Sequence, residues 1–227
     1  MRLDIGGKMR TFYLLFGLSF IFLTAVGFAQ DDWIVQGSAF VDGQRIVLTP
    51  DKPEQGGAAW SPKLVSLEES FTLDFLVYLG EDDEGADGIS FVFTTVPQYV
   101  GETGGTLGVF GIEPSLSVNI YTYSEGDDSS ERITVRVNAP GEHYELPLYR
   151  LPTLTDGQEH SMRVRWDASA RLLRVYIGES SEDLRIPRTW YYLPEAVFPD
   201  ETKVHYGFTG ATGGAYNLHY FVPKTRR

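Results

Sequence analysis

The 227-residue chain contains no cysteine, which excludes disulfide bonds, thiolate zinc sites and cysteine nucleophiles together. It has 19 basic residues against 31 acidic ones, and the resulting net charge of −12 argues against nucleic acid as a partner. A helical stripe of useful length, an internal repeat and a Ser/Pro-rich linker are also absent from the sequence. Apolar residues make up 42% of the chain and aromatic residues 14%, which is enough to bury a core and excludes a disordered protein.

The N-terminal segment has the layout of a secretory signal peptide. Basic residues precede an uncharged apolar run over 12–28, and small residues at its end fit a cleavage site after Ala29. An uncleaved signal anchor is the alternative, because the run lies at the lower length limit for spanning a bilayer. We expect a signal peptide over 1–29 and one domain over 30–227, with no membrane insertion of the mature chain. Export without disulfides favours a secreted or cell-envelope protein of a bacterium.

Alternation of apolar and polar residues dominates the rest of the chain. It occurs in six segments, at 71–79, 89–93, 118–122, 133–137, 162–166 and 173–177. A period of two places one face of each strand on a core and leaves the other face in water. Clusters of Gly, Asp and Ser separate the segments. Many short strands with such turns predict an all-β chain folded as an antiparallel β-sandwich.

Four stretches in sequence order are similar to one family. They are Leu48–Pro50 with Gly57–Trp60, then Gly85–Val92, then Gly104–Gly108 leading to Pro114–Val118, and finally Gly207–Gly214. Their order and spacing resemble the L-type (legume-type) lectin domain in its bacterial secreted form. The resemblance covers about 32–222 and implies a concanavalin A-like jelly roll that binds carbohydrate non-covalently.

Asp87 is the residue that the resemblance makes the main ligand of a sugar. In the family this aspartate follows a cis peptide bond that does not involve proline, and it accepts hydrogen bonds from sugar hydroxyls. A carboxylate beside glycines suits that role, because charge-assisted hydrogen bonds are the strong ones. The alternative is an acidic loop that simply stays solvated, which leaves the match beginning at Gly85 unexplained.

The resemblance adds five further residues to the expected carbohydrate site. It implies that Gly105 supplies a backbone N–H, that Glu125 stands where the family has an asparagine, and that the rim is formed by Thr212, Gly213 and Gly214. Glycine lets a ligand approach the backbone closely because no Cβ intervenes. Turns between strands need glycine as well, so a purely structural role of these glycines stays open.

The metal site is where the sequence departs from the family. The resemblance places Asn119 and Tyr121 at two acidic positions and Arg132 at a histidine. It keeps Asp128 outright, with Glu125 and Asp127 as candidate replacements for the missing ligands. A phenol and a guanidinium cannot supply the anionic oxygens that Ca²⁺ requires. We therefore expect a degenerate site with Asp128 as the remaining ligand, and a domain that functions without Ca²⁺. An ion pair of Arg132 with Asp128 or Glu125 would hold the loop in place of a metal, and a solvated Arg132 is the alternative.

Two other functions fit the same fold. A glycoside hydrolase needs two carboxyl groups about 5–5.5 Å apart when it retains configuration, but the strand best placed to carry them, over 117–123, has no acid. A structural or adhesive module that has lost sugar binding is the other alternative. We expect a lectin-like module and not an enzyme. Its net charge favours neutral sugars over sulfated or phosphorylated glycans and over anionic membranes.

Overall fold

The computed structural model describes the backbone of residues 33–98, 102–123, 131–150, 153–178, 184–185 and 197–224. The expected signal segment lies outside these ranges, and so do two predicted site residues, Glu125 and Asp128. Within the described part of the chain, no helix has the length and apolar character needed to cross a membrane.

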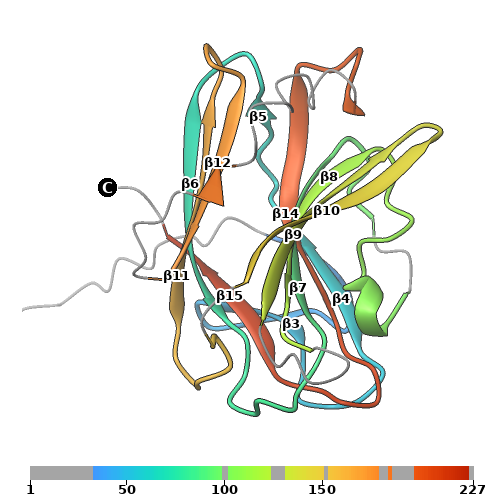
Figure 1. Ribbon diagram of the computed structural model, residues 1–227, viewed down its shortest axis with the longest axis vertical. Helices are drawn as coiled ribbons and strands as arrows, with labels where there is room; N and C mark the ends of the chain where they lie inside the picture. The colour runs from blue at the N-terminus through green and yellow to red at the C-terminus, as the bar shows by residue number, and fades with distance from the viewer. Residues whose placement is uncertain are drawn as a thin grey trace, which may run out of the picture.

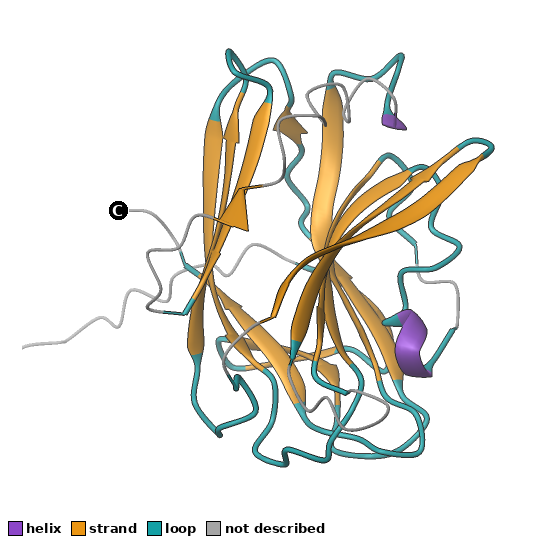
Figure 2. Cartoon of the chain, in the orientation of Figure 1, coloured by secondary structure: helices purple, strands orange, loops and turns teal. Residues whose placement is uncertain are grey.

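Strands form in every segment where alternation predicts them. They are β6 (Phe71–Tyr78), β7 (Gly88–Thr94), β8 (Ser115–Tyr121), β9 (Arg132–Ala139), β11 (His160–Asp167) and β12 (Leu172–Ile177). The other strands are β1 (Ile34–Gly37), β2 (Phe40–Asp42), β3 (Arg45–Thr49), β4 (Gly56–Trp60), β5 (Val65–Ser66), β10 (Glu142–Arg150), β13 (Leu184–Arg185), β14 (Lys203–Ala211) and β15 (His219–Pro223). Helical structure in the described ranges is limited to the 3₁₀ turn η1 (Gly104–Thr106) and the single residue Val197, and Figure 2 draws both in purple.

The strands pair into two antiparallel sheets that face each other (Figure 1). The first sheet has the order β1-β4-β14-β7-β8-β9-β10, with β5 paired to β14, and the second has the order β13-β12-β11-β6-β15-β3-β2. Each sheet combines consecutive strands, such as β7-β8-β9-β10, with neighbours that are distant in sequence, such as β4-β14 and β6-β15, as in a jelly roll. The prediction of an all-β sandwich is therefore confirmed.

The space between the sheets is filled by apolar residues of both sheets, from the alternating segments and from other strands. An aromatic cluster lies at its centre, where the Phe208 ring is 4.3 Å from that of Phe221 and 5.0 Å from that of Phe75, measured between centroids. All three side chains are at most 3% exposed. Each such side chain contributes on the order of 1.5–3 kcal/mol when fully buried, so this cluster fixes how the sheets face each other.

A second, smaller core covers the outer face of the first sheet. The loop over 102–114 lies on that face and buries Leu107 and Ile112 in a cluster with Trp60. The hydroxyl of Thr209 on β14 donates to the carbonyl oxygen of Leu107 at 2.7 Å. Strands β7 and β8 are consequently buried at every position. The loop that carries η1 is thus anchored to the sheet by apolar contact.

Candidate functional site

Four loops meet at one end of the sandwich, next to Asp87. In Figure 1, β14 runs from the upper end of the molecule to the lower end, and Ala211 is its last residue. The Asp87 N–H donates to the carbonyl oxygen of Ala211 at 3.1 Å, and the Gly104 N–H donates to that of Thr212 at 3.1 Å. The Thr212 N–H in turn donates to the carbonyl oxygen of Gln55 at 2.8 Å. Backbone hydrogen bonds therefore bring the loops over 50–55, 80–87, 102–106 and 211–218 together.

The carboxyl group of Asp87 is buried and incompletely bonded. The Ala86–Asp87 peptide is cis, and Asp87 is 8% exposed. Its Oδ2 has no hydrogen-bond partner among the described residues. Burial raises the pKa of Asp87 to about 6, although the N–H of Gly213 favours the charged form, and the nearby charge of Glu54 raises the pKa further. A buried oxygen without a hydrogen-bond partner destabilises the fold. A donor on a ligand would satisfy this oxygen and remove that cost.

Glycines keep the approach to this oxygen clear. A Cβ placed on Gly213 would lie 3.4 Å from Oδ2 of Asp87, and one placed on Gly104 would lie 4.0 Å from it. Gly104 also has a φ of +67°, which favours glycine. The site therefore presents an acceptor oxygen between two glycines, Gly104 and Gly213, whose missing side chains leave room for a ligand.

The other predicted site residues fall into three groups. Gly105 and Gly214 are exposed, and a Cβ on either would meet no atom within 4 Å. Thr212 is fully buried, and its hydroxyl donates to the carbonyl oxygen of Lys52 at 2.8 Å and accepts the N–H of Gln55 at 2.9 Å. The Thr212 side chain thus braces the loops instead of facing the rim. Glu125 lies outside the described residues, and its role stays a prediction.

Glu54 is a residue of this cluster that the sequence analysis did not single out. Its N–H donates to the carbonyl oxygen of Gly213 at 3.0 Å, and its Oε2 accepts the hydroxyl of Thr103 at 3.2 Å. Its φ of +54° is uncommon for a residue other than glycine. The available signal was its place between the Leu48–Pro50 stretch and Gly57, inside the family resemblance.

The described residues at the family's metal position do not fit Ca²⁺. Tyr121 donates its hydroxyl to Oε1 of Glu145 at 3.0 Å, and the amide of Asn119 donates to the hydroxyl of Thr134 at 3.1 Å. Burial first, and then the charge of Glu145, raise the pKa of the Tyr121 phenol, so it stays protonated. No group of three or more His, Cys, Asp or Glu side chains arranged to hold a metal occurs in the described ranges. A hydrogen-bonded network around Glu145 occupies this face of the sheet.

Arg132 contacts an aromatic ring and a backbone carbonyl. Its guanidinium carbon lies 4.2 Å from the centroid of the Tyr121 ring, and Nη1 donates to the carbonyl oxygen of Tyr123 at 3.0 Å. A cation over a phenol ring is attractive, and it places positive charge where a metal ligand would have to be negative. The expected ion pair with Asp128 or Glu125 involves residues outside the described ranges and stays a prediction.

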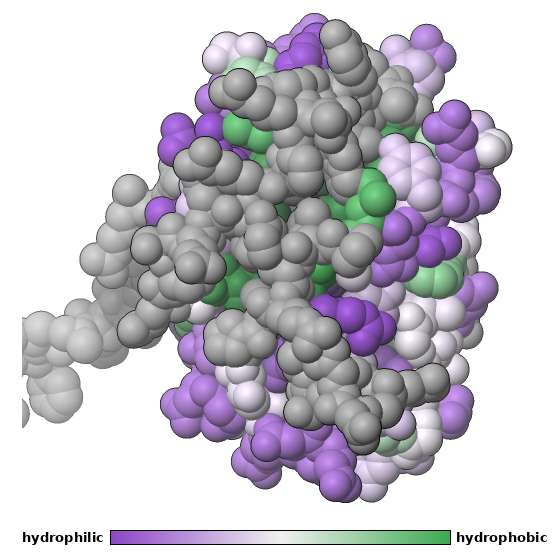
Figure 3. Space-filling model, viewed as in Figure 1, coloured by the Kyte–Doolittle hydropathy of each residue, from purple (hydrophilic) through white to green (hydrophobic). Residues whose placement is uncertain are grey.

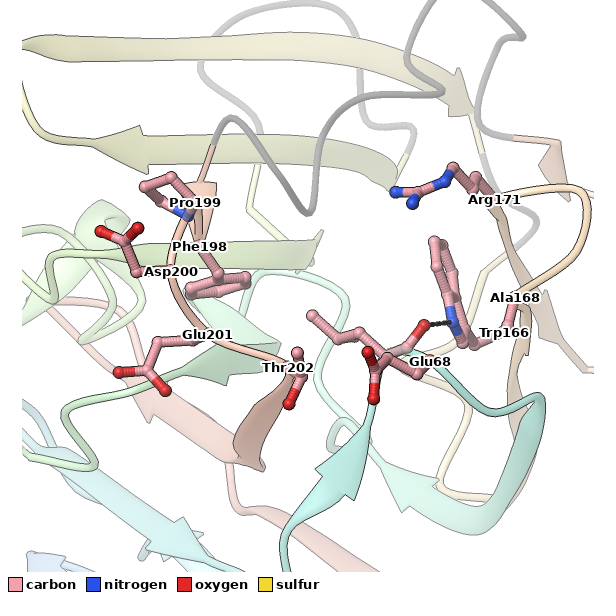
Figure 4. Close-up of a pocket in the computed structure, with 10 residues that line it drawn as sticks. Glu68, Trp166, Ala168, Arg171, Phe198, Pro199, Asp200, Glu201 and Thr202 are labelled. Atoms are coloured by element: carbon pink, nitrogen blue, oxygen red, sulfur yellow. Dashed lines mark hydrogen bonds between the residues drawn. The ribbon is translucent and has the colours of Figure 1, made fainter.

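A cavity of about 440 Å³ lies at the opposite end of the sandwich (Figure 4). Trp166 and Phe198 line it, and charged residues, among them Glu68 and Arg171, stand around it. The indole N–H of Trp166 already donates to the carbonyl oxygen of Leu67 at 2.9 Å. This cavity lacks an unsatisfied buried acceptor comparable to that of Asp87 within the described residues, so we place the candidate site at Asp87.

Two antiparallel sheets in a jelly roll, with this loop cluster at one end, define a lectin-like β-sandwich. The model of the legume lectin β-barrel domain matches residues 26–225, and the chain belongs to this L-type lectin domain family. The resemblance noted in the sequence is therefore confirmed.

Solved structures of lectins share the fold. A lectin from Bauhinia forficata in complex with GalNAc is 19% identical, with a TM-score of 0.65 over 87% of this chain and 92% of that one. The metal-free form of lectin I-B4 from Griffonia simplicifolia is 19% identical, with a TM-score of 0.65 over 88% and 94%. The Ca²⁺-bound exoplasmic/lumenal domain of VIP36 is 18% identical, with a TM-score of 0.62 over 86% and 84%.

A curated relative is much longer than this chain. It is the pesticidal crystal protein Cry22Aa of Bacillus thuringiensis, which is 24% identical over an alignment that covers 76% of this chain and 28% of that protein. The chain thus corresponds to little more than a quarter of that relative.

Proposed function

We propose that the protein is a secreted or envelope-bound lectin-like module that binds glycans non-covalently at the site around Asp87. In this proposal Asp87 accepts hydrogen bonds from sugar hydroxyls, the N–H of Gly105 donates one, and Gly213 and Gly214 shape the rim. Glu125 completes the site, and no catalytic step takes place.

The observation that carries this proposal is the unpartnered Oδ2 of Asp87, buried behind the glycines at Gly104 and Gly213. Sugar hydroxyls are donors of the right kind for such an oxygen, because hydrogen bonds to a charged acceptor are strong. Membership of the L-type lectin family supports the same ligand class. The net charge of −12 favours a glycan without anionic groups.

A glycan array probed with the mature protein, in calcium and again in EDTA, tests the proposal. We expect binding in both buffers and its loss in the variant Asp87→Asn, while Asp200→Asn, an exposed change at the opposite end of the molecule, keeps it. Binding that disappears in EDTA would contradict metal independence. Folded protein that binds nothing in either buffer would favour the non-glycan interaction module on the same fold.

A further inference from the structure

We propose that Glu54 is a second, specificity-determining carboxylate of the Asp87 site, and that it selects sugars with a free amino group over their neutral and anionic counterparts. The inference rests on the proposed glycan binding and names the class of sugar. It replaces the sequence-based expectation of a neutral ligand by that of a cationic one.

The position of Glu54 is fixed from both sides of the site. Its backbone N–H bonds to Gly213, whose carbonyl oxygen lies 3.0 Å away, and its carboxylate bonds to Thr103, the residue before Gly104. Gly104 and Gly213 are the two glycines that flank Oδ2 of Asp87. The Glu54 carboxylate therefore stands at the edge of the opening through which a ligand reaches Asp87.

The backbone of Glu54 adopts a conformation that its side chain disfavours. A φ of +54° places it in the left-handed region, which costs a residue with a Cβ roughly 1 kcal/mol or more relative to the right-handed one. Residues held in such conformations cluster at binding sites. Glu54 is also exposed, so its carboxylate is accessible to a ligand.

The charge of the surroundings complements a cationic ligand. The loops over 50–55, 80–87 and 102–106 contain Lys52 as their one basic residue. Their acidic residues are Asp51, Glu54, Glu81, Asp82, Asp83, Glu84, Asp87 and Glu102. Burial is the main cause of the raised pKa of Asp87, and the charge of the nearby Glu54 raises it further. An ammonium group between two carboxylates relieves their repulsion, a uronate or sulfate increases it, and a hydroxyl leaves it unchanged.

The same loops enclose a second acidic hollow on their other flank. A cavity of about 530 Å³ is lined by Asp51, Glu81 and Glu84 together with the ring of Tyr216, which is 40% exposed. Figure 3 shows the hydrophilic colouring that prevails at the lower end of the molecule. Acidic side chains therefore extend beyond the opening at Asp87 to this hollow.

The test compares sugars that differ only in the amino group. Affinities of glucosamine against glucose, galactosamine against galactose, and mannosamine against mannose are measured by titration calorimetry at low ionic strength. We expect the amino sugar of the recognised pair to bind roughly twofold to fivefold more tightly, which is the effect of one exposed ion pair. The difference should shrink in 0.5 M NaCl, where the screening length falls to roughly 4 Å.

Three variants locate the effect. Glu54→Gln keeps the backbone bond to Gly213 and should reduce the ratio of the two affinities, amino sugar over neutral sugar, to about onefold within the variant. Glu69→Gln removes an equal charge from an exposed position in a turn outside the site loops, and it should keep the preference. Thr103→Val, which frees the Glu54 carboxylate, should reduce the preference in part.

Three outcomes would overturn the inference. A neutral sugar that binds as tightly as its amino counterpart to the wild-type protein refutes it and leaves glycan binding intact. A preference that survives Glu54→Gln assigns the selectivity to other acids. Folded wild-type protein that binds no sugar of any pair refutes the proposed function together with this inference.

Discussion

Among single residues, Asp87 combines burial with an ionisable group that no described residue fully satisfies. Its carboxyl holds a proton up to about pH 6 in the folded chain, against 3.8 for the ordinary group. Between these values the folded state binds more protons than the unfolded one, so the stability that Asp87 contributes falls as pH rises through this window. We expect Asp87→Asn to raise the free energy of unfolding at pH 7 by about 1–2 kcal/mol. Urea denaturation checks this, and a destabilised variant would contradict it.

Ligand binding by Asp87 should follow the opposite pH dependence. A charged carboxylate accepts two hydrogen bonds, whereas the protonated form loses acceptor capacity. We expect glycan affinity to rise as pH increases through about 6, the pKa of the folded group. Titration calorimetry at pH 5 and pH 7.5 with the sugar found on the array measures it. Equal affinity at both values would exclude Asp87 as the charged acceptor.

His219 is a second buried titratable residue, and its effect on stability has the reverse sign. It is fully buried, with Nδ1 2.7 Å from the hydroxyl of Thr49, and burial lowers its pKa from 6.5 to about 3. The unfolded chain therefore binds the extra proton first, and stability is lost as pH falls below 6.5. In the Asp87→Asn background, we expect about 2 kcal/mol to disappear between pH 7.5 and pH 5.

The variant His219→Gln in the same background is the control for this loss. It removes the titrating group, so its free energy of unfolding should change little between the two pH values, whatever its absolute stability. A slope that persists in urea denaturation of the double variant would assign the pH dependence to other groups.

At the scale of elements, the start of β7 sets the position of Asp87. Gly88 has a φ of +129°, and a Cβ there would lie 2.0 Å from the carbonyl oxygen of Ile120 on β8. Gly88→Ala must push the two strands apart, and we expect a loss of roughly 3 kcal/mol or more in unfolding free energy together with loss of binding. Gly141→Ala, which also has a positive φ but meets no atom within 4 Å, should cost only about 1 kcal/mol. Equal losses would show that strand contact is not the cause.

The strands that sequence alternation predicts are those with several apolar residues in step. Phe75 and Val77 of β6, or Met162 and Val164 of β11, point to one core, and their spacing reveals this without a structure. Strands such as β2 and β5 are too short to show a period. Gly56–Trp60 forms β4 despite two glycines and two alanines, residues that disfavour strands, and burial between neighbours decides its structure.

Site residues were predictable from the sequence where they lie within a stretch that resembles the lectin family. Asp87 and Gly213 could be found from the stretches that contain them. Glu54 could not, because a run such as Asp51–Gln55 is typical of a solvated turn, and its contact with Thr103 joins segments 49 positions apart. Glu145 was missed for the same reason, since its partners Asn119 and Tyr121 lie on another strand.

For the molecule as a whole, the network around Glu145 predicts stability that does not depend on a metal. We expect the melting temperature to change by less than about 1 °C between calcium and EDTA, since ligands that bind only the folded state are what shift it. Differential scanning calorimetry of the purified protein measures this. An increase of several degrees in calcium would show that acids outside the described ranges, Glu125 and Asp128 among them, form a cation site.

The small core beneath the loop over 102–114 anchors one side of the site, and the other side of the site has no such anchor. Gly104 belongs to the anchored side, because moving it would pull Leu107 and Ile112 out of their buried apolar cluster. The segment over 51–55 belongs to the other side of the site, and its residues Asp51–Glu54 are exposed. Recognition of a different sugar can therefore be engineered by replacing this short segment alone, while the small core and the loop that it anchors stay unchanged.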